Sequence, residues 1–351
     1  MSTPFSIIIP THNQAPELKT HLPLVLEQDY SDFEVIVVDM ASTDETKQVL
    51  ENLELEYPAL RHTSTPATAR DISLERLALT LGIRTAKHEW VIITHANCQP
   101  ATSQWLQIFG QAAVEGKEIL VGVAKYDEQR RSWFNYKTSF FRLWNTQANL
   151  QHIRSGHAAV RADGCNIALR RSLFLSKNGF DSHLNLLSGA EELLVNRLST
   201  ASNTEVVSNP EAIVVEDVLP ERRLWKKHRV FYMETRRHQK NATPYRTKTN
   251  LKQWLPWLLI LVPGSLWPVL NYLHPDENVA ISIVMGLGFL LTLIILGAWA
   301  NSFSHRAQAI GYRRSYLFPF LLFAFALPLW NLSALLSYHL SPKKEFRKKF
   351  V

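Results

Sequence analysis

The sequence is poor in cysteine and lacks the common glycine-rich phosphate-binding motifs. Cys98 and Cys165 are the only cysteines among 351 residues, which excludes a disulfide framework and a four-cysteine zinc site and is typical of a reducing compartment. No GxGxxG follows the first strand-like run and no GxxxxGK[ST] occurs, which argues against a dinucleotide-binding Rossmann enzyme and a P-loop NTPase. The N-terminal MSTPFSIIIP has no signal-peptide pattern, so we expect the soluble part in the cytoplasm.

The positive charge is concentrated in one block. The formal net charge is +7, and between residues 222 and 252 eleven Lys and Arg residues accompany a single acid, Glu234. This block comes just before the first long apolar segment, so we interpret it as a juxtamembrane patch that meets anionic lipid headgroups. No aromatic-interleaved RNA-binding motif accompanies it, and no nucleic-acid partner is expected.

Three apolar segments occupy the last hundred residues: 254–273, 279–299 and 316–337. Each is close to the roughly 20 residues that cross a bilayer core. The basic flanks, including the tail 341–351, favour an even number of crossings by the positive-inside tendency. We therefore expect two spans followed by a re-entrant or interfacial segment, with both ends cytoplasmic. A third span, or a first segment whose prolines prevent it from crossing, stays open.

The first 250 residues alternate short apolar runs with helical patterns. FSIIIP, FEVIVVD and WVIIT are continuous apolar runs of the kind found in parallel strands covered on both faces. Helical spacing of apolar residues lies between them, over residues 17–28, 43–53 and 74–86. This order predicts a right-handed parallel α/β sheet. Ligands of such sheets collect at the carboxyl ends of the strands, which are PTHN, DMASTD and HANCQP here.

Several motifs in order resemble those of family 2 glycosyltransferases with the GT-A fold. They are SIIIPTHN, VIVVDMASTDET, ATARDISLERLALTLGIRTAK, GCNIALRRSLF, GFDSH and GAEELLVNRL, and the match covers roughly residues 5–235. The pattern is similar to membrane-anchored members from bacterial surface-polysaccharide pathways. We expect an α/β GT-A domain over 1–235, divided into a nucleotide-sugar half (1–125) and an acceptor half (126–235), then a basic linker (236–253), a membrane region (254–340) and a basic tail.

The resemblance implies a divalent cation, Mn²⁺ or Mg²⁺, that stabilises the charge of the leaving diphosphate. Members of the family end the relevant strand in Asp-x-Asp, where this sequence has His95, Ala96 and Asn97. Neutral imidazole and an amide oxygen still coordinate Mn²⁺, although neither carries negative charge. Residual metal binding at His95 and Asn97 and no metal binding are both open.

The resemblance also implies nucleotide-sugar contacts at four residues. Asp39 is expected to accept from a ring N–H of the base, Thr11 and Asn13 to line the same pocket, and Arg70 to reach phosphate or ribose. Each has a simpler alternative. Asp39 is also placed to cap a helix, Thr11 and Asn13 to form a turn, and Arg70 to pair with Asp71.

GAEELLVNRL supplies the expected general base. Counting back from its arginine, Glu191 falls on the second acidic position of the family's Glu-Asp motif, whose Asp deprotonates the acceptor hydroxyl, and Glu192 follows it. The alternative is that both are favourable first-turn charges on a helix dipole. Asn166, Arg170 and Asp181 resemble the acceptor-side framework.

These expectations combine into one function. The sequence predicts inverting transfer of one sugar from a nucleotide-diphosphate sugar to a membrane-presented acceptor, such as a lipid-linked saccharide, by a multi-pass protein of the bacterial cytoplasmic membrane. The Gln-x-x-Arg-Trp motif of processive synthases is absent, so polymerisation is not expected. The alternative is a non-catalytic scaffold descended from a transferase, because the Asp-x-Asp and Glu-Asp motifs have both changed.

Overall fold

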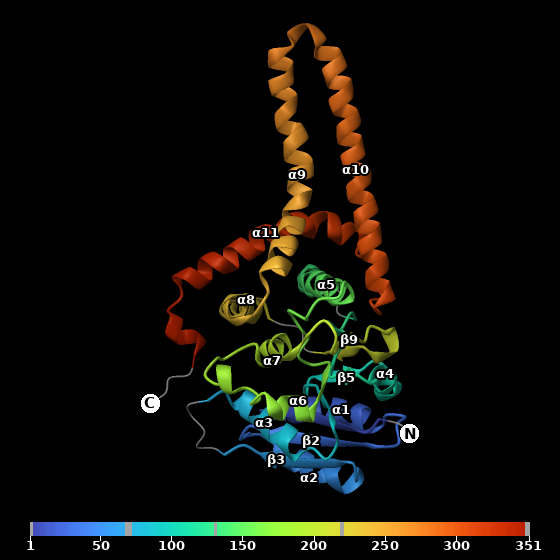
Figure 1. The fold of residues 1–351 in the computed structure, drawn as a ribbon, viewed down its shortest axis with the longest axis vertical. Coiled ribbons are helices and arrows are strands. Elements are labelled where there is room, and N and C mark those ends of the chain that lie inside the picture. Colours follow the sequence, from blue (N-terminus) through green and yellow to red (C-terminus); the bar gives the residue numbers. More distant parts are fainter. Residues whose placement is uncertain (1–2, 67–71, 130–131, 218–220, 348–351) are drawn as a thin grey trace.

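The computed structural model describes residues 3–66, 72–129, 132–217 and 221–347, so Arg70 lies outside the described residues. Figure 1 shows three tiers along the long axis of the molecule: an α/β domain that holds the N-terminus, a pair of long helices beside it, and a helical hairpin that projects away from both.

A mixed sheet forms the centre of the α/β domain. Its seven strands have the order β3-β2-β1-β4-β8-β6-β9, and a second sheet has the order β5-β10-β7. Strands β1 to β4 are parallel, whereas β8 runs antiparallel to β4 and β6. The strands are β1 (Phe5–Thr11), β2 (Phe33–Asp39), β3 (Leu60–Ser64), β4 (Trp90–Ile93), β5 (Cys98–Pro100), β6 (Ile119–Val121), β7 (Ala124–Tyr126), β8 (Ile167–Arg170), β9 (Thr204–Val206) and β10 (Val214–Glu216).

Helices cover both faces of the large sheet. Because alternate residues of a strand face opposite sides, Ile7 and Ile9 pack in a core with α1, α2 and α4, whereas Ile8 packs in a second core with α3, α6 and α7. The domain helices are α1 (Ala15–Leu26), α2 (Thr46–Glu56), α3 (Leu74–Thr85), α4 (Trp105–Ala112), α6 (Arg171–Ser176) and α7 (Ala190–Leu198). The predicted α/β class is confirmed, and the first three expected helices are present with ends that differ by a few residues.

The parallel strands bring the predicted ligand loops to one edge of the sheet. Thr11 lies opposite Asp39, and Asp39 lies opposite Ser64. Strand β4 ends at Ile93 beside β1, and the chain then turns toward His95. The loops PTHN, DMASTD and HANCQP are therefore neighbours, as expected for a doubly covered parallel sheet.

Three helices of the described chain are long and apolar enough to cross a membrane. They are α9 (Thr243–Leu273), α10 (Asn278–Ala309) and α11 (Leu317–Leu340). In Figure 1, α9 and α10 form an antiparallel hairpin, and α11 lies across its base. Within the most apolar part of each helix, 11% of residues are buried for the two hairpin helices and 28% for α11, which packs on α5 (Trp133–Arg154) and α8 (Arg222–His238). The third helix therefore differs from the hairpin in both direction and packing.

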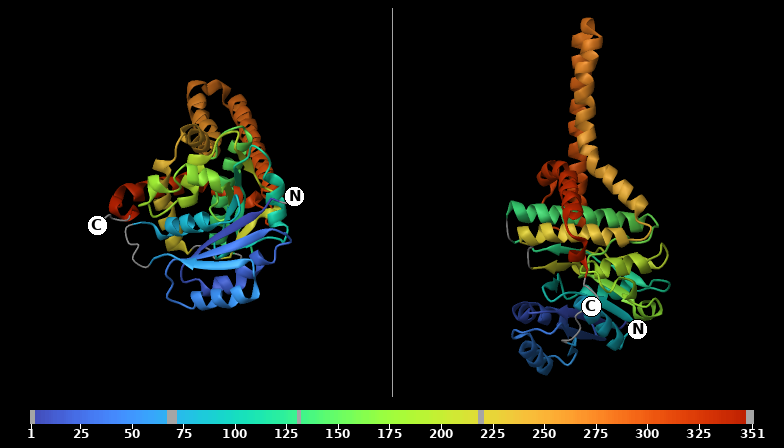
Figure 2. Two further views of the ribbon diagram at one scale, coloured as in Figure 1. Left: turned by 60° about the horizontal axis from the view of Figure 1, so that its bottom comes forward. Right: turned by 90° about the vertical axis from the view of Figure 1, so that its left-hand side faces the viewer.

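The basic segment 236–253 is largely helical rather than a separate linker. Helix α8 runs to His238, and α9 begins at Thr243 and continues through three internal prolines. Figure 2 shows that α9 bends along its length, the usual effect of proline within a helix. The prolines therefore bend the first apolar helix without ending it.

Asn166, expected on the acceptor side, holds three parts of the domain together. Its Nδ2 donates to the backbone carbonyls of Val123 at 2.7 Å and Ala212 at 3.0 Å, and its Oδ1 accepts from Trp105 Nε1 at 3.0 Å. The side chain is fully buried, and a Cβ on Gly122 would lie 2.6 Å from Asn166 Cγ. These contacts give Asn166 a structural role.

We expect Asn166→Ala to lower the free energy of unfolding by about 3 kcal/mol, because it leaves buried polar groups without partners. Denaturant unfolding of the detergent-solubilised full chain measures this. Asn52→Ala, at an exposed position of α2, is the control and should change stability by less than about 0.5 kcal/mol. Equal losses in the two variants would contradict the structural role.

Candidate active site

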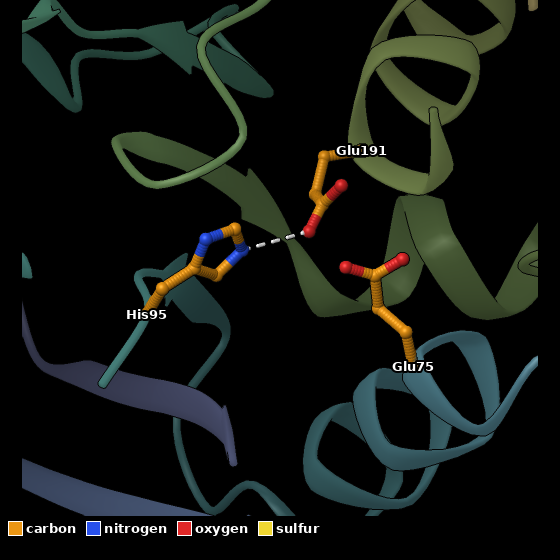
Figure 3. Close-up of side chains that lie close together, drawn as sticks. All are labelled: Glu75, His95 and Glu191. Carbon is orange, nitrogen blue, oxygen red and sulfur yellow. Dashed lines mark hydrogen bonds and ion pairs between the residues drawn. The ribbon is translucent and has the colours of Figure 1, made fainter. Parts of the chain in front are cut away.

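Three ionisable side chains from distant segments converge beside the strand ends. Glu75 lies in the first turn of α3, His95 follows β4, and Glu191 lies in the first turn of α7. Figure 3 shows them pointing toward one another. His95 Nε2 lies 3.0 Å from Glu191 Oε1, and one ligand atom from each residue lies within 4.8 Å of the others.

The three groups set one another's protonation. Burial disfavours the charged form of His95, but the hydrogen bond and negative charge of Glu191 outweigh it and raise the pKa of His95 to about 10. Burial also opposes ionisation of Glu191, yet His95 holds its pKa below the ordinary value. Burial and the charge of Glu191 raise the pKa of Glu75 to about 7. At neutral pH the site thus holds an imidazolium, a carboxylate and a carboxyl group close to its titration midpoint.

This donor set fits a divalent cation. One imidazole nitrogen and two carboxylates suit Mn²⁺ and related ions. Asn97 Nδ2 donates to Glu216 Oε1 at 3.3 Å, and a ligand role for its Oδ1 stays a prediction. Glu75 joins His95 and Glu191 in the group that the structure brings together. Sequence reasoning missed Glu75 because no spacing links the start of α3 to the end of β4.

Thr11, Asn13 and Asp39, the predicted nucleotide-side residues that the structure describes, lie together at the neighbouring strand ends. Asn13 has a positive φ of 50°, and its Oδ1 accepts from the backbone N–H of Thr43 at 2.7 Å. Asp39 accepts from the backbone N–H of Ser42 at 3.0 Å and from its hydroxyl. Thr11 is fully buried at the end of β1. These contacts join the first two ligand loops into one surface.

A cavity of about 420 Å³ opens beside the cluster. Its wall includes His95, Arg142, Arg161, Glu191, Glu192 and Arg229, and α5 and α8 supply much of it. Glu192 accepts from Gln239 Nε2 at 2.6 Å and lies 3.4 Å from Arg161 Nε. Burial raises the pKa of Glu192 despite the nearby Arg161. The two predicted catalytic glutamates therefore share the cavity, but only Glu191 contacts His95.

Two further acceptor-side predictions lie away from this cavity. Arg170 Nε donates to the carbonyl of Lys117 at 3.0 Å, and its guanidinium stacks over the ring of Trp90. Asp181 is exposed at the start of a short 3₁₀ turn, Asp181–His183. The structure does not bring either side chain to the cluster.

Arg76 fixes the loop that leads to Glu191. It is fully buried and donates to the backbone carbonyls of Leu186 and, at 2.8 Å, Ser188. Gly189 follows with a φ of 70°, and a Cβ there would lie 2.3 Å from Thr235 Cγ2. The chain therefore requires glycine at position 189, just before α7. Arg76, which sequence reasoning missed, fixes the loop that precedes this glycine.

Comparison with known proteins identifies the class of this fold and site. Residues 6–174 match the family Glycosyl transferase family 2. A mannosyltransferase of Pyrobaculum calidifontis, solved in complex with GDP-Man and Mn²⁺, has a similar structure with a TM-score of 0.56 and 17% identity, covering 97% of this chain and 88% of that chain. TarS of S. aureus in complex with UDP-GlcNAc has a TM-score of 0.47 and 15% identity over 96% of this chain and 92% of that chain. No curated protein matches the sequence.

The fold is of the GT-A type, with a membrane-directed helical region at its C-terminal side. Residues 6–174 form a glycosyltransferase family 2 domain, and the protein is a glycosyltransferase whose class of reaction is sugar transfer from a nucleotide-sugar donor. The resemblance noted from the ordered motifs is confirmed.

The proton on His95 makes metal binding depend on pH. A divalent cation that takes His95 Nε2 has to displace this proton, so we expect the apparent Mn²⁺ affinity to rise by about tenfold per pH unit between about pH 6.5 and 8.5. Calorimetric titration in buffers of different ionisation enthalpy counts the released protons. His95→Gln should remove most of the binding and the pH dependence. Affinity that does not change with pH would exclude His95 as a ligand.

Proposed function

We propose that the protein transfers one sugar from a nucleoside-diphosphate sugar to an acceptor presented at a membrane, with inversion at the anomeric carbon. The observation that carries this proposal is the position of the cluster of Glu75, His95 and Glu191. It lies between the strand ends, where family members bind the donor, and a cavity walled by α5 and α8. Those two helices lie between the α/β domain and the base of the hairpin (Figures 1 and 2).

Glu191 is the proposed general base. It accepts the proton of the acceptor hydroxyl while the acceptor oxygen forms a bond to the anomeric carbon and the bond from that carbon to the diphosphate breaks. The imidazolium of His95 lies beside Glu191 and supplies positive charge where the diphosphate departs. When held by His95 and Glu75, a divalent cation, Mn²⁺ or Mg²⁺, would replace the His95 proton and supply the positive charge there instead of the imidazolium.

The other predicted residues have supporting roles in this proposal. Thr11, Asn13 and Asp39 hold the nucleoside at the strand ends, and Arg70 stays a predicted phosphate or ribose contact. Glu192 keeps the acceptor wall in place through Arg161 and Gln239.

We expect Glu191→Gln to lower transfer at least about a hundredfold, because the amide does not take up the acceptor proton. Binding of UDP or GDP should remain close to wild type, since the carboxylate acts on the acceptor. Single-turnover assays with panels of nucleotide sugars measure transfer, and Glu51→Gln, an exposed acid on α2, is the control. Loss of nucleotide binding would assign Glu191 a structural role. A wild-type protein that binds donors without any transfer would favour the scaffold alternative.

The membrane arrangement supports a lipid-linked saccharide as acceptor in bacterial surface-polysaccharide synthesis. We propose that α9 and α10 cross the cytoplasmic membrane, that α11 lies along its cytoplasmic face, and that the catalytic domain is cytoplasmic. The acidic turn between the hairpin helices, Pro275–Glu277, is at the far end from the basic residues of α8. This distribution agrees with the positive-inside tendency.

Cysteine labelling in intact spheroplasts tests this topology, because both natural cysteines are buried. Asp276→Cys should react with a membrane-impermeant maleimide added outside, whereas Lys344→Cys should react only after lysis. Labelling of Lys344→Cys from outside would show that α11 also crosses the membrane.

A further inference from the structure

Three arginines line the cavity, and they differ in whether a carboxylate pairs with them. Arg142 lies 3.2 Å from Asp163 and 2.7 Å from Glu216. Arg161 faces Glu192 at 3.4 Å. Within the described ranges, no carboxylate forms an ion pair with Arg229, although the side chain lines the same cavity.

Arg229 is nevertheless buried. It is only 8% exposed, and its Nε has no hydrogen-bond partner among the described residues. Nη2 donates to Asn331 Oδ1 of α11 at 3.1 Å, and the guanidinium lies 4.8 Å from the ring centroids of both Phe141 and Trp225. Burial lowers the pKa of Arg229 to about 10, which leaves the group charged at neutral pH.

Other cations gather around the same tryptophan. Lys137 Nζ lies 4.8 Å from the ring centroid of Trp225 and 4.4 Å from that of Trp330. Burial lowers the pKa of Lys137, and the charges of Arg229, Lys226 and Arg222 lower it further. No ion pair to any of these four cations occurs in the part of the chain that the structure describes.

A buried cation without a counter-ion is costly, and an anionic ligand removes the cost. A guanidinium with free donors matches a phosphate group particularly well, since its planar N–H groups reach two oxygens together. The position of the group favours a lipid as the source of that phosphate. Arg229 is joined to α11 at the base of the hairpin, and the indole rings of Trp225 and Trp330 suit a boundary between polar and apolar surroundings.

We propose that Arg229, with Lys137 beside it, binds the phosphate group of a membrane lipid that enters the cavity between α5 and α8. The assignment of this lipid as the acceptor rests on the proposed function. Its phosphate would lie at the cationic end of the cavity, and the hydroxyl that reacts would extend toward Glu191, which lines the same cavity. The site recognises a phosphate group, and the competitors below distinguish a lipid headgroup from free phosphate and from the donor nucleotide.

Binding of a radiolabelled prenyl monophosphate to the full chain tests this site. The protein is reconstituted in nanodiscs of zwitterionic phosphatidylcholine, and the corresponding prenol, inorganic phosphate and UDP or GDP serve as competitors. The variants are Arg229→Gln, Arg229→Lys and Asn331→Ala. Arg223→Gln is the matched control, because it removes the same charge from an exposed position on α8.

We expect Arg229→Gln to weaken prenyl-phosphate binding at least about tenfold, as loss of a charge-assisted contact does. Arg229→Lys should bind with intermediate affinity. Arg223→Gln should bind like wild type, and so should Asn331→Ala, which removes the contacts of α11 to Arg229 and to Gln253 but no positive charge. The prenol and inorganic phosphate should compete poorly. This binding measurement needs neither a sugar donor nor turnover. It therefore tests the phosphate site even where no sugar transfer is detected.

Three results would overturn the proposal. Arg229→Gln that binds prenyl phosphate like wild type would exclude the residue. Competition by inorganic phosphate or by nucleotide at concentrations similar to the lipid would assign the site to a soluble anion instead. If Arg229→Gln is too unstable to test, Arg229→Lys takes its place in the experiment. A lysine variant that folds but binds no prenyl phosphate would show that the positive charge does not hold the ligand.

Discussion

The contact between His95 and Glu191 joins two segments that lie 96 positions apart in the chain. His95 follows the parallel strand β4, whereas Glu191 lies in the first turn of α7. Glu191 is buried and His95 is partly buried, and each stabilises the ionised form of the other. Removing either one leaves a charge without its partner. The pair therefore links the loop after β4 to the start of α7 electrostatically.

The chain supports that pair from two directions. Arg76 binds the backbone of the loop before α7 from the side of the sheet. The segment that follows the membrane helices approaches from the other side: Leu187 N–H donates to the carbonyl of Phe346 at 3.1 Å, and the Phe346 ring is buried. A residue beyond the last apolar helix thus contacts the loop that sets Glu191. The helices that are long and apolar enough to cross a membrane are therefore physically connected to the geometry of the site.

The sequence predicted the elements better than the contacts between them. Continuous apolar runs specify buried parallel strands, and the ends of those strands, where ligands collect, point to His95. The resemblance of GAEELLVNRL to a family motif points to Glu191. Their pairing was not predicted, because 96 positions separate them and no periodicity crosses that distance. Glu75 was missed for the same reason. Asn166 was selected from a motif as an acceptor-side residue, but a motif does not show which way a side chain points. In the structure this side chain binds Val123, Ala212 and Trp105 inside the domain.

The charged groups in and beside the cavity differ in whether a carboxylate faces them. Near the sheet, Arg142 and Arg161 are matched by carboxylates, so that region is close to neutral overall and suits a hydroxyl-rich sugar. Toward α11, Arg229 and Lys137 lie against aromatic rings with no matching acid among the described residues. In the function that we propose, this difference in charge would orient an amphiphile whose anionic group lies between its sugar and its apolar chain. The same difference in charge would favour one orientation of the bound amphiphile over the other. In the reverse orientation, the cations of the protein and the anionic group of the ligand would both lack partners.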